Sequence, residues 1–405
     1  MKISLDSLKG DQQQRFLDYF NAAFRQRSLS LNGTASFAED GTYTAKLTGP
    51  FPVGNSSNSI SWIIARNPDG TMPFIEVLSD IAPEPGWEAA VHTFVTEILV
   101  SALAEKVVKF FRRRAFHYVG PNLGGEYWLP GFRLAPAIPN DDTPQMINAE
   151  RVVYIDQNVE AIDDMHAHTL ADEIARRHAA RLSLVLNVGM YYPQPEQRWF
   201  LRIQSDPPKI SSERSQLGFV DSSHTTSVMP EKGNECPLGD YGGSVLDSWR
   251  SAGLLTCPAE TRRILRGVDN GEPRLREAFD RCARLWQVAG VAGRMFPSVG
   301  MAYEIAAVEA ITSAYPEYGS FSGFVRQNVP AIEGLENFLA FLYGSVRSAH
   351  FHAGEFPLGE FLALRIDITD SDVLERTNMR ASGYEIIRKS IMSWILRATE
   401  SNSST

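Results

Sequence analysis

The stretch LYGSVRSAHFHAGEF, residues 342–356, decides the fold class of the C-terminal part of this chain. An apolar stripe at helical spacing leads into it, formed by Leu335, Phe338, Leu339, Leu342 and Tyr343. The stretch then carries Arg347, His350 and His352 within six positions, and Gly354 follows them. Amphipathic spacing indicates a helix, and a glycine just beyond the last turn is typical of a helix end. The pattern predicts a helix with one buried face and cationic side chains near its C-terminus.

The helical period extends outward from this stretch over residues 259–400. Four or five candidate helices occupy this range, which predicts an all-α bundle. Residues 206–258 are rich in Pro, Gly and Ser, a composition typical of a connector. Residues 1–205 alternate between strand and helix periods, so we expect an α+β region of one or two subdomains.

Within the N-terminal region, two Asp-Gly turns predict hairpins, at AEDG (38–41) and at NPDG (67–70). Helices are predicted over 11–27, 85–116 and 159–188, strands over 151–157 and 197–204, and loop or irregular strand over 120–148. The basic run FFRRR (110–114) falls at the end of the second predicted helix. It either contacts RNA phosphates or complements the helix dipole, and the second interpretation is the commoner one in proteins.

Composition limits the classes of function. The chain has 405 residues and a net charge of −9, which argues against a protein that coats nucleic acid through many basic side chains. Its three cysteines, Cys236, Cys257 and Cys282, are odd in number and widely spaced, which argues against a zinc site or a disulfide framework. No apolar run has the length of a signal peptide or a membrane span. We therefore expect a cytoplasmic protein that needs neither metal nor cofactor.

The motif around Arg347 resembles the signature of HEPN domains, an arginine and a polar residue followed after a short spacer by a histidine. Arg347, Ser348 and His352 match this signature with a spacer of four. The sequence is most similar to the Apea-like HEPN group, in which LY precedes the arginine and two glycines follow the histidine. This chain departs from that pattern at Ala353, in the place of the first glycine, and has one extra residue before Arg347.

Two further segments support the resemblance, which covers residues 259–400. The segment YEIAAVEAI (303–311) resembles the glutamate-bearing helix that pairs with the motif helix in this group. The segment ARRHAARLSLVLNVG (175–189) is similar to a leucine-rich helix that often precedes these domains. The resemblance thus implies an α+β N-terminal region followed by an all-α HEPN helical bundle.

The resemblance implies a metal-independent endoribonuclease that acts as a homodimer. In such enzymes the ribose 2′-OH attacks the adjacent phosphate and leaves a 2′,3′-cyclic phosphate. The family also implies a toxin-like role in prokaryotic antiphage or abortive-infection defence, with RNA, including tRNA, as the substrate and a phage-derived trigger. The N-terminal region would then sense a partner or ligand. The alternative is an inactive HEPN module for dimerisation or nucleotide binding, with the function in residues 1–205.

Residue chemistry assigns the roles. Histidine titrates near neutral pH, and the arginine fork suits phosphate oxygens. On an α-helix, positions five apart diverge by about 140°, so Arg347 and His352 should point apart while His350 shares the face of Arg347. This divergence favours a composite site built from two protomers. His352 is then the acid or base, His350 a supporting residue, and Ser348 a hydrogen-bonding residue.

Other polar residues have plainer interpretations. Glu304 and Glu309 are candidates to pair with Arg347. His166 and His168 follow two aspartates, but positions two apart on a helix do not converge on a metal, so we expect a solvated helix face.

Overall fold

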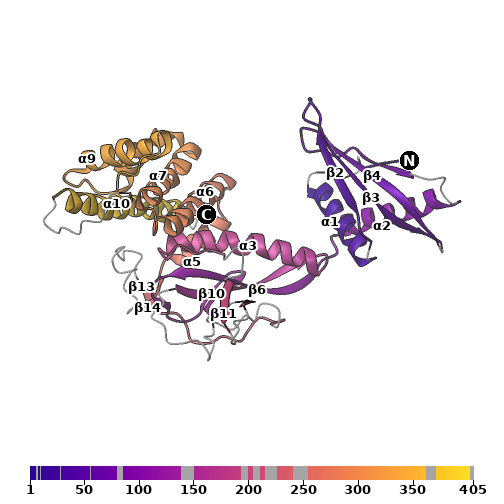
Figure 1. Cartoon of the computed structure of the whole chain (residues 1–405), viewed down its shortest axis with the longest axis horizontal. Helices are drawn as coiled ribbons and strands as arrows, with labels where there is room; N and C mark the ends of the chain where they lie inside the picture. Colours follow the sequence, from indigo (N-terminus) through magenta and orange to yellow (C-terminus); the bar gives the residue numbers. More distant parts are fainter. Residues whose placement is uncertain are drawn as a thin grey trace. The chain divides into compact units, whose positions relative to one another are not determined.

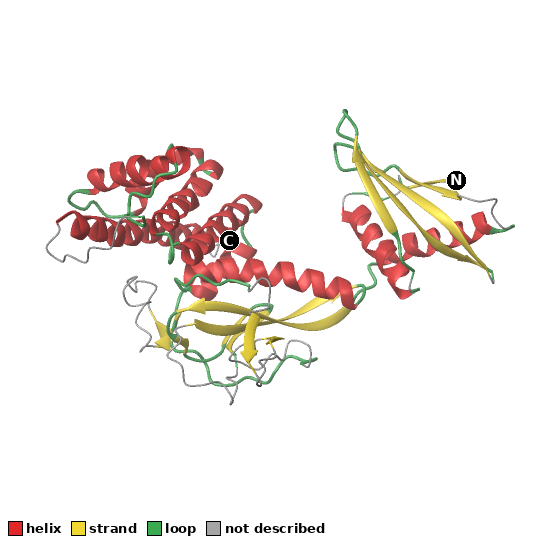
Figure 2. Ribbon diagram, in the orientation of Figure 1, coloured by secondary structure: helices red, strands yellow, loops and turns green. Residues whose placement is uncertain are grey.

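The computed structural model describes residues 1–5, 8–9, 11–27, 29–54, 56–79, 85–137, 150–192, 199–203, 210–214, 226–239, 254–361 and 371–401. Its secondary structure is mixed, with sheets in the N-terminal part and helices in the C-terminal part (Figure 2). The chain forms two compact units. Unit 1 contains Met1–Phe110 and Val159–Leu170, and unit 2 contains Phe111–Asn158 and Ala171–Thr405.

Unit 1 is an antiparallel five-stranded sheet with the strand order β1-β5-β4-β3-β2. Its elements are β1 (Lys2–Ser4), α1 (Asp11–Gln26), β2 (Asn32–Phe37), β3 (Tyr43–Val53), β4 (Ser56–Arg66), β5 (Phe74–Ser79) and α2 (Trp87–Ala104). Both predicted hairpins are confirmed, since β2 pairs with β3 and β4 with β5. Gly41 and Gly70 occupy the turns at φ 82° and 85°, a left-handed conformation that glycine adopts without strain. The predicted helix over 11–27 is confirmed as α1.

Helices α1 and α2 cover one face of this sheet (Figure 2). Their aromatic side chains meet Trp62, which is fully buried on β4. The ring of Phe20 lies 5.2 Å from that of Trp62, and Phe24 lies 5.2 Å from Phe94. The burial of these large rings holds the two layers of unit 1 together.

Unit 2 begins with a four-stranded sheet in the order β6-β10-β9-β8. Its elements are β6 (Val108–Val119), β7 (Asn122–Leu123), β8 (Tyr127–Leu129), β9 (Phe132–Pro136) and β10 (Glu150–Ala161), followed by α3 (Asp164–Val185). The start of β6, the end of β10 and the first turns of α3 are counted with unit 1. Helix α3 packs on this sheet (Figure 1). The rings of Phe132 and His178 stack there with centroids 3.9 Å apart. The predicted strand over 151–157 is confirmed within β10, and α3 begins later than predicted because residues 159–161 still belong to that strand.

The prediction of one helix over 85–116 is wrong in its second half. Helix α2 ends at Ala104, Glu105 takes a left-handed conformation at φ 51°, and β6 begins at Val108. The side chains of β6 alternate between the two faces of the sheet, as the two-residue period of a strand requires. Phe116 and Tyr118 enter the core on the α3 side, and Arg114 bonds Asp172 of α3 on that side.

The basic run 110–114 therefore lies on a strand, at neither a helix end nor an open surface. Arg113 makes two hydrogen bonds to Asp156 of β10, at 2.6 and 2.9 Å, and Arg133 bonds the same carboxylate. Asp156 is fully buried, so these arginines serve to satisfy a buried charge.

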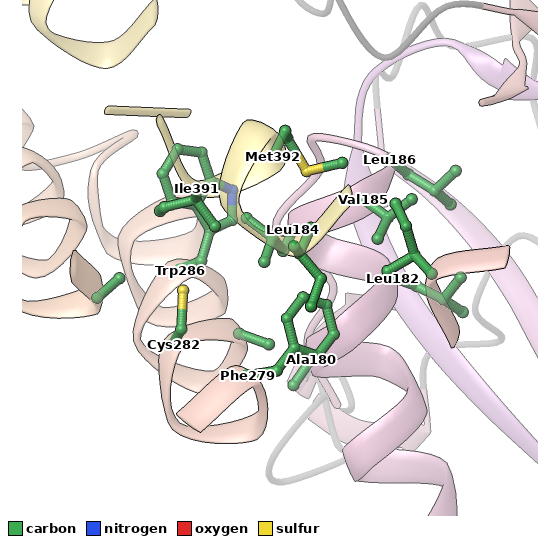
Figure 3. Close-up of a cluster of buried hydrophobic side chains, with 14 of the residues drawn as sticks. Ala180, Leu182, Leu184, Val185, Leu186, Phe279, Cys282, Trp286, Ile391 and Met392 are labelled. Carbon is green, nitrogen blue, oxygen red and sulfur yellow. The ribbon is translucent and has the colours of Figure 1, made fainter. Parts of the chain in front are cut away.

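The C-terminal part is helical, as expected. It contains α5 (Thr261–Asp269), α6 (Pro273–Ala292), α7 (Pro297–Ala314), the 3₁₀ turn η1 (Pro316–Tyr318), α8 (Phe321–Asn328), α9 (Leu335–Ala340), the π-helix η2 (Phe341–Ala353) and α10 (Ser371–Ser401). These helices share one continuous hydrophobic core with α3 and the β6–β10 sheet. Figure 3 shows side chains of α3, α6 and α10 meeting in that core, among them Leu184, Phe279 and Ile391.

The compact units divide the chain at positions other than the expected boundaries at 205 and 258. Gly189, just after α3, meets Gly290 of α6 so closely that a Cβ on Gly189 would lie 2.4 Å from the Gly290 carbonyl carbon. Arg181 of α3, which is 1% exposed, pairs with Asp280 of α6 and with Asp269 of α5. Contacts of this kind join α3 to the helices of residues 259–400.

The expected connector over 206–258 also contributes to unit 2 where it is described. It contains β12 (Ile210–Arg214), β13 (Leu238–Gly239), β14 (Leu254–Leu255) and β15 (Cys257–Pro258). The predicted strand over 197–204 is confirmed as β11 (Trp199–Ile203), which pairs with β12. Strand β14 pairs with β7, and Cys236, Leu255 and Cys257 are buried in the common core.

Candidate active site

The motif residues lie on η2, which continues directly from α9. Leu342 and Val346 are its fully buried side chains, and they fix one face of the helix against the core. Gly383 of α10 permits this packing, because a Cβ there would come within 2.8 Å of Leu342 Cδ2. The helix ends at Gly354, whose φ is 67° and whose N–H donates to the His350 carbonyl at 3.1 Å. Core contacts on one side and a left-handed glycine at the end thus set the position of the motif.

The expectation that Arg347 and His352 point apart is wrong. Arg347 Nη1 lies 3.4 Å from His352 Nε2 within one chain. A π-helix closes its hydrogen bonds between residues five apart, so residues i and i+5 lie much closer to one face of the helix than they do on an α-helix. The wider turn brings together two side chains that an α-helix would separate.

His350 also differs from its expected place, because it does not join Arg347. Its Nδ1 lies 3.3 Å from the Glu355 carbonyl oxygen, and its ring packs edge-on against Phe351 and Phe356 at 5.3 and 5.2 Å. His350 therefore contacts the segment after the helix.

Glu309 of α7 contacts Arg347 from the neighbouring helix. Its Oε2 accepts hydrogen bonds from Arg347 Nε and Nη2, both at 3.3 Å. The side chains of Arg347 and Glu309 are 26% and 27% exposed, so this ion pair is open to solvent on one side. Glu309 thus occupies two nitrogens of the guanidinium and leaves Nη1 to face His352.

Glu304, the second predicted partner, does not reach Arg347. It is buried at 6% exposure, and its Oε2 has no hydrogen-bond partner in the part of the chain that the structure describes. Burial raises the pKa of Glu304 to about 8, and Arg380 offsets this only in part. Of the two predicted partners, Glu309 therefore belongs to the cluster and Glu304 is buried away from Arg347.

Aromatic rings flank Arg347 on its own helix. The guanidinium carbon lies 5.5 Å from the ring of Tyr343 and 5.8 Å from the ring of Phe351, and both rings are partly exposed. The sequence pattern assigned Tyr343 to the apolar stripe and did not single out Phe351, although their spacing of four on either side of Arg347 was visible. Ser348 is half-buried, and its side chain makes no hydrogen bond to any residue that the structure describes.

The contact between Arg347 and His352 has one possible hydrogen-bond direction. Arginine is only a donor, so a hydrogen bond across this 3.4 Å contact forms with the tautomer of His352 that has no proton on Nε2. An exposed imidazole nitrogen next to a fixed cation can take a proton from an incoming hydroxyl while the cation faces a developing negative charge.

The other polar residues singled out in the sequence have structural roles. Asp163 accepts a hydrogen bond from the His166 backbone N–H at 2.7 Å at the start of α3, and His166 Nδ1 faces the Ile162 N–H at 3.3 Å. Within the described ranges, no group of three His, Cys, Asp or Glu side chains is arranged to hold a metal ion.

A carboxylate that sequence analysis did not single out anchors the segment after η2. Glu360 accepts hydrogen bonds from the backbone N–H and, at 2.8 Å, from the hydroxyl of Ser298, in the first turn of α7. The Leu358 N–H donates to the same hydroxyl at 3.0 Å. This clamp joins the segment that contacts His350 to the helix that carries Glu309.

Comparisons of the chain with protein-family models, with curated proteins and with solved structures found no match. Among the described helices, none combines the length and the apolar character needed to cross a membrane.

Proposed function

We propose that this protein is a metal-independent endoribonuclease whose reacting groups are Arg347 and His352. The contact between Arg347 Nη1 and His352 Nε2 carries the proposal, because it puts a proton acceptor and a fixed cation within reach of one phosphate. Four parts of the proposal rest on the sequence resemblance. They are the assignment to Apea-like HEPN domains, the homodimer, RNA as the substrate, and a role in antiphage or abortive-infection defence.

The chemistry follows from these groups. His352 takes the proton of a ribose 2′-OH, whose oxygen attacks the neighbouring phosphorus. Arg347 faces the negative charge that develops on the phosphorane oxygens, and Glu309 holds its guanidinium in place. The bond between phosphorus and the 5′-oxygen breaks, the leaving oxygen takes a proton from solvent, and the products are a 2′,3′-cyclic phosphate and a 5′-hydroxyl. His352 is exposed on η2, so a polymeric substrate can reach it.

The test is cleavage of an RNA pool by the full-length protein in EDTA, with analysis of the product ends. We expect 2′,3′-cyclic phosphate ends and a loss of about 10²-fold or more in rate for His352→Ala and for Arg347→Ala. His168→Ala is the matched control, because His168 is an exposed histidine on α3 in unit 1, and it should cleave as the wild type does. Cleavage that disappears in EDTA and returns with a divalent ion would overturn the proposal.

One observation favours the alternative of a non-catalytic module. The charge of Arg347 is already balanced by Glu309, as in a cluster whose role is purely structural. That alternative predicts no RNA cleavage by the wild type and a change in oligomeric state for Arg347→Ala. Sedimentation of both proteins alongside the cleavage assay separates the two functions.

A further inference from the structure

Two of the three cysteines, distant in the sequence, lie against each other in unit 2. Cys236 and Cys257 are both free thiols, 4% and 0% exposed, and their side chains are within hydrogen-bonding reach of one another. Cys282 is also free and buried, but it lies on α6. The chain thus contains one thiol pair and one isolated thiol.

The backbone holds the two cysteines in fixed positions. The Cys257 N–H donates to the carbonyl of Pro237, the residue next to Cys236, at 3.1 Å. The Cys236 thiol lies 3.6 Å from that same carbonyl oxygen and 3.6 Å from the carbonyl oxygen of Leu255. The Cys236 N–H in turn donates to the Glu126 carbonyl at 2.7 Å. The two thiols therefore meet because adjacent chain segments are hydrogen-bonded together.

The environment makes the two sulfurs unequal. The hydrogen bond from the Cys257 thiol lowers the pKa of Cys236 to about 7, against the opposing effect of burial. The same hydrogen bond and burial raise the pKa of Cys257. Among the described residues, Tyr118 and Tyr127 also interact with the two cysteines, and burial raises the pKa values of both phenols. Cys236 is also the more exposed of the two, at 4% against 0%, so it is the thiol that an incoming disulfide reaches first.

We propose that Cys236 and Cys257 form a reversible disulfide by exchange with a low-molecular-weight disulfide. The Cys236 thiolate attacks one sulfur of the small disulfide, forms a mixed disulfide and expels one small thiolate. The Cys257 thiol then loses its proton to solvent, and its sulfur attacks Cys236 Sγ and expels the second small thiolate. The protein loses two electrons and two protons, and the small disulfide becomes two thiols. No part of this proposal depends on ribonuclease activity.

The experiment uses oxidised glutathione on the folded, reduced full-length protein. Remaining thiols are blocked with N-ethylmaleimide, and peptides are mapped by mass spectrometry without reductant. We expect a Cys236–Cys257 cross-link that forms slowly, because both sulfurs are buried, and that dithiothreitol reverses. Cys282→Ser should give the same cross-link as the wild type.

Two variants test the order of attack. Cys257→Ser should accumulate glutathione on Cys236, because no second thiol resolves the mixed disulfide, whereas Cys236→Ser should acquire neither adduct nor cross-link. The peptide map of the wild type alone overturns the proposal if both Cys236 and Cys257 remain free thiols after treatment of the folded protein with oxidised glutathione. Cross-links to Cys282 as abundant as the Cys236–Cys257 link would overturn it as well.

Discussion

Arg347 and His352 lie five residues apart and yet touch, with 3.4 Å between Nη1 and Nε2. The π-helix makes this possible, and a continuous π-helix is rare because its hydrogen-bond geometry is less favourable than that of an α-helix. In this chain, tertiary contacts hold both the buried face of the π-helix and the segment that follows it. Leu342 and Val346 fix its buried face, and the segment after it is tied to α7 through Glu360 and Ser298. Tertiary contacts thus set the helical register that forms the candidate site.

The position of the pair within one chain makes a prediction about mixed protomers. If RNA cleavage is confirmed, mixing Arg347→Ala protein with His352→Ala protein should not restore it, because each chain lacks one member of its own pair. The rate of RNA cleavage measures this, with a mixture of wild type and His352→Ala as the control. Activity well above that of either variant alone would instead indicate a site shared across two protomers.

The contact with Glu309 predicts a positioning role. Glu309→Ala should lower the rate constant of cleavage about tenfold, equal to about 1.4 kcal/mol, since Arg347 loses the acceptor that orients it. Glu309→Gln retains an acceptor oxygen and should lose less. Glu336→Gln is the control, because Glu336 forms a comparable, exposed ion pair with Arg326. A loss in Glu336→Gln equal to that in Glu309→Ala would contradict a specific role.

Burial of Glu304 predicts a pH dependence of stability. Its folded-state pKa of about 8 lies above the ordinary value of 4.5. The favourable contribution of the neutral carboxyl is therefore complete below about pH 4.5 and is lost as the pH rises toward 8. Glu304→Gln should remove this dependence, which amounts to at most about 1.4 kcal/mol per pH unit.

Denaturant unfolding at several pH values between 5 and 8 measures the effect of Glu304. Glu309→Gln is the matched control on the same helix, because Glu309 is partly exposed and already paired with Arg347. Equal slopes of unfolding free energy against pH in the wild type and Glu304→Gln would show that the buried carboxyl does not titrate in this range.

Breaking the buried ion pair between Arg181 of α3 and Asp280 of α6 should lower the free energy of unfolding. Asp280→Ala leaves the buried guanidinium of Arg181 with Asp269 as its remaining carboxylate partner, so unfolding should become easier by about 3 kcal/mol. Glu277→Ala, one turn earlier, removes an exposed pair with Arg281 and should change stability by less than about 1 kcal/mol. Chemical denaturation of the three proteins checks both values.

The shared core predicts how a truncated chain behaves. Residues 259–405 expressed alone should not fold cooperatively, because Phe279 of α6 and Ile391 of α10 would lose Leu184 and the rest of α3 as packing partners. Thermal unfolding followed by circular dichroism checks this. A sharp transition in the fragment would show that the helices of residues 259–400 form an independent domain.

The sequence by itself determined part of the local structure. The Asp-Gly turns specified the β2–β3 and β4–β5 hairpins of unit 1, because only a few residue types tolerate the left-handed turn positions at Gly41 and Gly70. Helical periodicity located the C-terminal helices, since an apolar stripe is a property of neighbouring residues. The residue types of the candidate site, an arginine and a histidine at the end of an apolar helix, were also visible.

Only the tertiary structure decided which of these residues meet. The side-chain spacing of Arg347 and His352 is compatible with an α- or a π-register, and packing of Leu342 against Gly383 together with the Glu360 clamp selects between them. Likewise, the segment FFRRR is compatible with a helix or a strand from its sequence alone. In the structure it is a strand, with Arg113 bonded to Asp156 on one face of the sheet and Arg114 bonded to Asp172 on the other. Contacts between residues far apart in the chain depend on the whole fold, and local sequence patterns do not contain that information.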